Sequence, residues 1–181
     1  IIKYVVDNKI DLVYSVGSDL AMPSVAAVSE RLDMPHFVSL NAAHICNNKN
    51  LLREHLGKEF KGNLDYTVLS KVPEEIALEF PVVMKPVDSQ GQRGVIKLNN
   101  MDELKRNFEH SLSFSQNKKV IIEEFVEGDE VSVNIFLENG EIKFALVSDR
   151  EVWDGYPGGI IHKHILPSKY QGRQKKDILD L

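Results

Sequence analysis

The segment from Pro81 to Val95, PVVMKPVDSQGQRGV, constrains the fold of this chain more than any other. It begins as an apolar run that favours a buried strand, carries Lys85 at the end of that run, and continues into a loop with Gly91 and Gly94. An ammonium group that ends a buried strand carries a large desolvation cost, which a facing anion would relieve. The segment therefore predicts a strand and loop that can hold a phosphate; a surface lysine at a strand end is the alternative of about equal weight.

The loop from Asp88 to Gly94 supports the phosphate interpretation in two ways. Its glycines allow backbone N–H groups to approach an anion closely, and Arg93 could add a charged fork. The loop is neither a Walker A sequence nor a GxGxxG sequence, and a hairpin turn with two glycines explains it equally well.

A second informative segment, Glu123 to Glu130 (EEFVEGDE), ends the apolar strand expected over Lys119–Val126. Strand alternation puts Glu123 on one face and Glu124 on the other, so at least one glutamate shares a face with apolar residues. A strand that leaves a sheet offers free N–H and C=O groups that can read an adenine edge, and Glu130 could accept hydrogen bonds from ribose hydroxyls. Two solvated glutamates at a fraying strand end are the alternative.

Composition limits the classes of protein that fit these segments. The chain has 181 residues, 43% of them apolar and 27% charged, which is typical of a soluble globular protein. A net charge of −5 argues against nucleic-acid binding. The single Cys46 excludes an internal disulfide and fits a reducing cytoplasm. No apolar run approaches the roughly 20 residues of a membrane span, and we expect no signal peptide. Because the chain opens at Ile1 and stops within an amphipathic pattern, we expect a piece of a longer protein.

The first part of the chain predicts a βαβ unit with a parallel sheet. Residues 11–16 and 36–40 read as strands, and the helix between them has Pro23 in its first turn and an apolar face at helical spacing. A further helix starts at Asn48 and ends at Gly57 as a C-cap.

The remainder predicts mainly strands and hairpins. Asn100 and Glu103 form an N-cap and N3 pair for one helix, and Asn139-Gly140 is a strong hairpin signal. The residues 149–151 read as a mixed-charge turn. The expected strands cover residues 66–69, 82–85, 94–98, 119–126, 131–137 and 141–147.

Two histidines, His162 and His164, would face the same way on a strand. That spacing permits a metal pair, but without a third ligand nearby we favour exposed or substrate-contacting histidines. No metal ligand and no catalytic residue is assigned from the sequence.

Taken in order, these parts resemble the ATP-grasp superfamily, and most closely its carboxylate–amine ligase and carbamoyl-phosphate synthase group. The resemblance implies an α/β fold, α+β in the ATP-grasp part, and spans nearly the whole chain. Residues 1–43 resemble the C-terminal part of a Rossmann-like pre-ATP-grasp domain. Residues 44–126 resemble a linker helix and the ATP-grasp small lobe, and residues 127–181 part of the large lobe.

The resemblance also assigns roles by position. Lys49 matches the first phosphate-binding lysine, although the aspartate usual before it is Asn48 here. Lys85 matches the second, residues Glu123–Val126 match the adenine-reading hinge, and Glu130 matches the ribose-binding glutamate. Arg150, His162 and His164 lie where the second substrate is expected. The ATP-binding candidates are Lys49, Lys85, Ser89, Gln90, Gly91, Gln92, Arg93, Gly94, Glu123, Glu124, Phe125, Val126 and Glu130.

The function implied is that of an ATP-dependent ligase forming carbon–nitrogen bonds. The intact enzyme would phosphorylate a small carboxylate, and an amine would attack the acylphosphate; the piece alone is expected to be inactive. Magnesium is expected in the intact enzyme, but nothing after Glu141 matches the family's E-x-N ligands, so they are expected outside this chain. The resemblance allows a homodimer and leaves the carboxylate and amine open.

Three alternatives remain at this level. A bicarbonate-activating relative, such as a biotin carboxylase or carbamoyl-phosphate synthase, shares the same ATP-binding parts. A non-catalytic nucleotide-binding module would keep the cleft without the chemistry. A βαβ interaction domain without a ligand is the third, because a fold does not determine a function.

Overall fold

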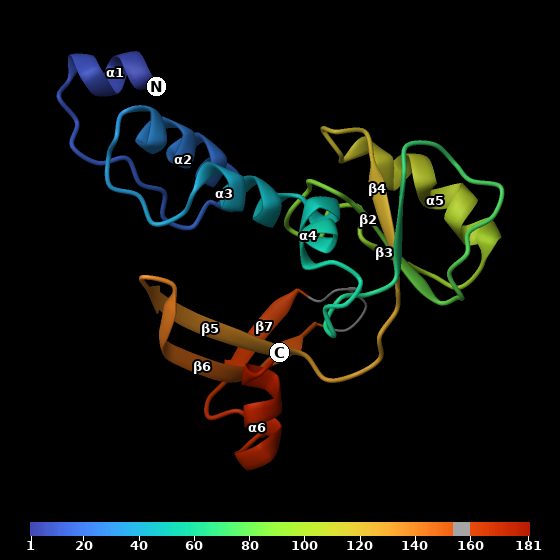
Figure 1. Ribbon diagram of the computed structural model, residues 1–181. Coiled ribbons are helices and arrows are strands. Elements are labelled where there is room, and N and C mark those ends of the chain that lie inside the picture. The colour runs from blue at the N-terminus through green and yellow to red at the C-terminus, as the bar shows by residue number, and fades with distance from the viewer. Residues whose placement is uncertain (154–159) are drawn as a thin grey trace. The chain divides into compact units, whose positions relative to one another are not determined.

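The computed structural model describes residues 1–153 and 160–181. The chain divides into two compact units, Ile1–Asn63 and Leu64–Leu181, which are described separately below (Figure 1). In the part of the chain that is described, no helix is both long enough and apolar enough to cross a membrane.

The first unit is built from short helices. In α2, Pro23 lies in the first turn, and the helix buries Val25, Ala26 and Val28 on one side. Gly57 ends α4 with φ of 73°, which confirms the predicted C-cap. The elements are α1 (Ile2–Asp7), a 3-10 turn (Asp19–Ala21), α2 (Met22–Arg31), α3 (Leu40–Asn47) and α4 (Lys49–Leu56).

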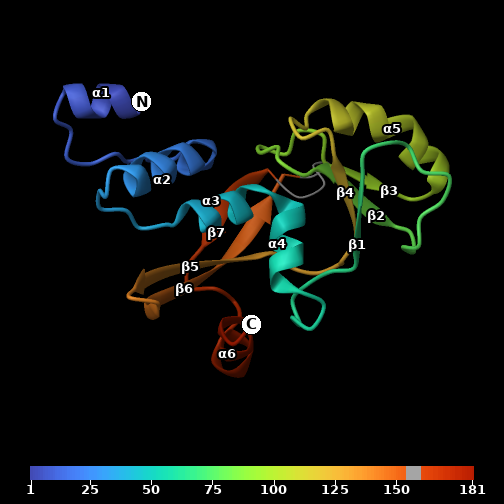
Figure 2. The same ribbon diagram turned by 45° about the horizontal axis from the view of Figure 1, so that its top comes forward.

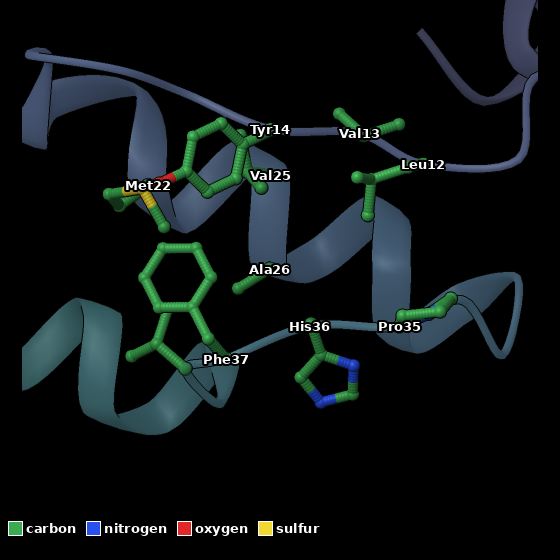
Figure 3. Close-up of a pocket in the computed structure, with 10 residues that line it drawn as sticks. Leu12, Val13, Tyr14, Met22, Val25, Ala26, Pro35, His36 and Phe37 are labelled. Atoms are coloured by element: carbon green, nitrogen blue, oxygen red, sulfur yellow. The ribbon is translucent and has the colours of Figure 1, made fainter. Parts of the chain in front are cut away.

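The two strands predicted in this unit are not formed, and neither is the parallel sheet expected between them. Residues 1–63 are all described and contain no strand. Residues 12–14 and 35–38 instead line a small apolar pocket beside α2, where the ring centroids of Tyr14 and Phe37 lie 5.5 Å apart (Figure 3). A strand requires a hydrogen-bonded neighbour, and neither segment has one here.

A second difference from the predicted structure lies at Ser39. The hydroxyl of Ser39 accepts a hydrogen bond from the N–H of Ala42 at 3.1 Å, and α3 begins directly after it. Ser39 is therefore an N-cap, and the chain turns helical where the sequence predicts the end of a strand.

The second unit opens with a four-stranded antiparallel sheet whose order is β1-β4-β2-β3. Helix α5 (Met101–Ser113) covers one face of this sheet (Figure 2). Leu104 and Phe108 of α5 are fully buried against Val82, Met84 and other apolar side chains. Burying each such side chain contributes about 1.5–3 kcal/mol, so this face is the core of the sheet. The strands are β1 (Tyr66–Leu69), β2 (Val82–Pro86), β3 (Ile96–Leu98) and β4 (Val120–Glu124).

The start of α5 confirms the predicted cap. The side chain of Asn100 accepts a hydrogen bond from the N–H of Glu103 at 2.9 Å. The carboxylate of Glu103 accepts one in return from the N–H of Asn99 at 2.8 Å, and this bond lowers the pKa of Glu103. The two bonds satisfy backbone donors that the helix itself leaves unpaired.

A three-stranded antiparallel sheet follows, with the order β5-β6-β7. Its strands are β5 (Val131–Glu138), β6 (Glu141–Val152) and β7 (Ile161–Ile165), and α6 (Gly172–Leu179) comes after them. Asn139 and Gly140 have φ of 53° and 80°, as the predicted hairpin turn requires. Residues 149–151 were predicted as a turn, and this is wrong, because pairing with β7 extends β6 to Val152.

Candidate functional site

The face of the four-stranded sheet opposite α5 carries the charged side chains. Cross-strand partners share a face, so Tyr66, Glu123, Val83 and Lys97 form one row across β1, β4, β2 and β3. Lys85 lies on the same face, two residues after Val83 along β2. Alternation along the strands thus directs Val82, Met84 and Ile122 to α5 and places Lys85, Lys97 and Glu123 on the opposite face, together with Val83 and Ile121.

Lys85 and Glu123 form an ion pair on this face. The ammonium of Lys85 contacts a carboxylate oxygen of Glu123, and the side chains are 22% and 3% exposed. Two of the predicted site residues are therefore in direct contact. A buried ion pair is a poor source of stability, because the desolvation cost offsets much of the attraction. These two charges are therefore better candidates for binding a ligand than for stabilising the fold.

The register decides which glutamate belongs to which surface. Glu123 faces Lys85, whereas the carboxylate of Glu124 accepts a hydrogen bond from the N–H of Asp65 at 3.3 Å. The N–H of Glu124 donates to Asp65 at 3.1 Å, and that of Phe125 donates to Pro81 at 3.2 Å. The predicted hinge is thus hydrogen-bonded, up to Phe125, to the residues that directly precede β1 and β2, and the next residue, Val126, is exposed.

The surface is hollowed at this hinge, where β4 ends. A cavity of about 400 Å³ opens there. Its lining combines apolar side chains with three carboxyl groups: Asp65, Ala77, Leu78, Glu79, Phe80, Pro81, Glu124 and Phe125.

The two glycines of the predicted phosphate loop have different surroundings. A methyl group added at Gly94 would lie 2.9 Å from side-chain carbons of Phe114 and Pro86, and the Gly94 carbonyl accepts a hydrogen bond from the Ser111 hydroxyl at 2.8 Å. Gly91 has φ of 66° and no atom within 4 Å of such a methyl group. The loop is therefore anchored at Gly94 and open at Gly91. Within it, the guanidinium of Arg93 donates to the carbonyl of Gln90 at 3.1 Å.

The three-stranded sheet brings together other predicted residues. Arg150 lies 3.3 Å from a carboxylate oxygen of Glu130, and its backbone N–H donates to the Glu130 carbonyl at 3.0 Å. His164 pairs with Arg150 across the strands, and its Nδ1 lies 3.2 Å from the Ser148 hydroxyl.

His162 has different neighbours from His164. Its ring centroid is 4.7 Å from that of Trp153, and its Nε2 is 3.7 Å from a carboxylate oxygen of Glu151. The two histidines lie on one strand, as expected, but they contact different groups.

A further cluster, which we call the carboxylate latch, consists of Asp129, Asp149, Ser168, Lys169 and Tyr170. Asp129 accepts from the Lys169 ammonium at 2.5 Å and from the Tyr170 hydroxyl at 2.6 Å, and these hydrogen bonds lower its pKa. Asp149 accepts from the Ser168 hydroxyl at 2.5 Å and the Lys169 N–H at 2.9 Å, which lowers its pKa too. Sequence reasoning missed this cluster, because no local pattern connects residues some 20 to 40 positions apart.

Lys97 was also missed. Its ammonium lies 3.5 Å from the centroid of the Phe125 ring. Alternation along β3 could have placed Lys97 on a face, but only the strand pairing brings it beside Phe125.

Lys49 is the first residue of α4 and belongs to the first unit. Among residues 1–153 and 160–181, no three His, Cys, Asp or Glu side chains form a group that could hold a metal ion.

Comparison with known proteins identifies relatives among ligases. The chain is 27% identical over 158 residues to D-alanine--D-alanine ligase B of Clostridium perfringens, covering 77% of this chain and 51% of that protein. It is 26% identical over 133 residues to a carbamoyl-phosphate synthase of Methanobrevibacter smithii, covering 70% of this chain and 35% of that protein. The chain thus spans about half the length of the first relative and about a third of the second.

The fold is also similar to that of a ligase. The structure of an L-amino acid ligase from Bacillus licheniformis superposes with a TM-score of 0.78 at 19% identity, over 98% of this chain and 42% of that one. At this identity the likeness shows the fold. The model of the ATP-grasp domain matches residues 78–177, from the segment before β2 into α6. Since this match covers more than half of the chain and includes both the Lys85–Glu123 pair and the hairpin sheet, the chain belongs to the ATP-grasp family.

Proposed function

We propose that this chain is the ATP-binding part of a ligase that activates a small carboxylate as an acylphosphate for attack by an amine. The observation that carries the proposal is the Lys85–Glu123 pair, on the face of the sheet opposite α5 and at the end of the strand that leads into the glycine loop.

The residues present fit a nucleoside triphosphate. An ammonium has three N–H donors, so a contact to one Glu123 oxygen leaves donors of Lys85 for a phosphate oxygen. Gly91 combines a positive φ with open space, which lets loop N–H groups approach an anion. The charged face and the open loop therefore meet the two requirements of a phosphate site.

The chain's own residues would bind and orient the nucleotide. Bound ATP supplies the phosphoryl group that activates the carboxylate. Lys85 and the loop would neutralise phosphate charge, the backbone at Val126 would read the base, and Glu130 would accept from the ribose. Catalysis of phosphoryl transfer is mainly positioning and charge neutralisation, which these groups can provide.

Several further assignments belong to the proposal through the family. Lys49 would be another phosphate-binding lysine, and Arg150, His162 and His164 would contact the second substrate. Magnesium would be held by residues outside this chain. The intact enzyme would act in the cytoplasm, and a homodimer is compatible with it. Residues 1–43, 44–126 and 127–181 would be the pre-ATP-grasp part, the small lobe and part of the large lobe.

Calorimetric titration of the full-length protein with ADP tests the proposal. Lys85→Met should raise the Kd for ADP about 10- to 100-fold, the loss expected for one charge-assisted hydrogen bond of about 1.5–3 kcal/mol. Lys105→Met, on the exposed side of α5, is the matched control and should leave the Kd unchanged.

Lys85→Met leaves the buried Glu123 without this partner, which could unfold the protein. The double variant Lys85→Met/Glu123→Gln removes both charges and separates the two effects. An ADP affinity that is unchanged in both variants would exclude Lys85 as a phosphate ligand, and absence of ADP binding by the unmodified protein would exclude the proposed function.

A bicarbonate-activating ligase is the second candidate. It is favoured by the similarity to the carbamoyl-phosphate synthase of Methanobrevibacter smithii. A non-catalytic nucleotide-binding module would bind ADP equally well, so only turnover can exclude it.

A further inference from the structure

Lys97 occupies the charged face of the four-stranded sheet, yet no expectation from the sequence assigns it a role. Its cross-strand partner is Val83, which places it in the row of Glu123 and on the same side of the sheet as Lys85. Both Lys97 and Phe125 are half-buried. A lysine here could bind a phosphate or could position the hinge, and the strand register distinguishes these two roles.

The position of Lys97 along the strands indicates the hinge. Lys85 precedes the glycine loop, whereas Lys97 pairs with Val83, two residues further from that loop. Phe125 lies beyond the other end of β2, where its N–H donates to Pro81 at 3.2 Å. The ammonium of Lys97 therefore lies over the ring at the hinge end of the face, at 3.5 Å from its centroid.

We propose that Lys97 is a positioning residue that fixes the nucleotide-binding hinge by holding the Phe125 ring through a cation–π contact. The backbone of Phe125 is held by Pro81 and its ring by Lys97, so two independent contacts hold the residue immediately before Val126. A cation over an aromatic face is stabilised by the ring quadrupole, more strongly where water is partly excluded. Because Lys97 would act through the base-reading backbone, its role rests on the proposed function.

The test compares two probes of the full-length protein by calorimetry. ADP reports on the base and the phosphates together, and tripolyphosphate reports on the phosphates alone. Lys97→Met keeps the length of the side chain and removes the charge. It should raise the Kd for ADP about three- to tenfold, the size that a half-buried cation–π contact supports, and change the Kd for tripolyphosphate less than twofold.

Two further variants separate positioning from folding. Lys97→Arg retains a cation that can lie on the ring, and it should restore the ADP affinity. In a Phe125→Leu background, Lys97→Met should have no additional effect, because the partner of the cation is already gone. The binding stoichiometry reports the folded fraction, so unfolding would lower the stoichiometry for both probes alike.

The other outcomes overturn the inference in distinguishable ways. If Lys97→Met raises the Kd for tripolyphosphate by the same factor as the Kd for ADP, Lys97 is a phosphate ligand. Unchanged binding of both probes would leave it a surface lysine. Failure of the unmodified protein to bind either probe would overturn the proposed function, and the role of Lys97 with it.

Discussion

Gly94 and Gly91 show how one loop can need glycine for two different reasons. At Gly94 the backbone passes within contact distance of Phe114 and Pro86, so the absence of a side chain permits the packing. At Gly91 the space is open, and only the positive φ of 66° favours glycine. Gly94 therefore serves the fold, whereas Gly91 has open space around it for the proposed phosphate ligand.

This difference predicts unequal costs of substitution. Gly91→Ala should cost about 1 kcal/mol, because alanine is strained at positive φ. Gly94→Ala should cost about 1–3 kcal/mol more, because its methyl group would also overlap Phe114 and Pro86. Urea unfolding of the full-length protein measures both, and equal midpoints at equal slopes would contradict the packing role of Gly94.

Glu123 and Glu124 show what residue-level reasoning could not decide. The sequence predicts that the two face opposite ways, which is correct, but alternation is symmetric and cannot say which one faces a cation. The pairing of β4 with β2 decides it, because that register brings Glu123 beside Lys85.

At the level of elements, the carboxylate latch connects three segments of the second unit. Asp129 precedes β5, Asp149 lies in β6, and Ser168 to Tyr170 follow β7. The neighbouring residues Glu130 and Arg150 form the ion pair described above. The carboxylate latch thus lies beside two of the predicted site residues, because Glu130 and Arg150 directly follow Asp129 and Asp149 in the chain.

The lowered pKa values of Asp129 and Asp149 predict an acid-sensitive latch. A carboxyl group whose pKa is lower in the folded state stabilises that state above its ordinary pKa of about 3.9, and the effect is lost as the pH falls through the folded value. Hydrogen-exchange protection of the Lys169 N–H should therefore be constant from pH 7 to 5 and fall below about pH 4. In Asp149→Asn this fall should be smaller.

The N–H of Arg150 is the internal control for this measurement. It donates to a backbone carbonyl of the same sheet, which does not titrate in this range. A parallel loss of protection at Arg150 and Lys169 would indicate global unfolding, in contradiction to a local latch.

Elements were predictable where their signals are local. The cap of α5, the turn at Asn139-Gly140 and the end of α4 at Gly57 each depend on a few adjacent residues, and all three are confirmed. The strands expected at residues 11–16 and 36–40 are absent, because an apolar segment becomes a strand only beside a hydrogen-bonded neighbour.

At the scale of the whole molecule, turnover distinguishes the candidate functions. The full-length protein should convert ATP to ADP at least tenfold faster with an amino acid supplying the carboxylate and an amine present than with ATP alone, because the phosphoryl group needs an acceptor. Coupled measurement of ADP release, over a panel of amino acids and over bicarbonate, checks this. Stimulation by bicarbonate alone would favour the second candidate, and ADP binding without any stimulated turnover would favour a non-catalytic module.

The sequence by itself determined the strands and helix around the glycine loop, the hairpin and the family resemblance, because these depend on periodicity, caps and turns within a few residues. Only the tertiary structure decided that Glu123 meets Lys85, that Lys97 lies over Phe125 and that Asp129 holds Lys169 and Tyr170. Each of these contacts joins segments about 30 to 40 residues apart. Their partners follow from strand order and register, which hydrogen bonding across the sheet sets and no local pattern encodes.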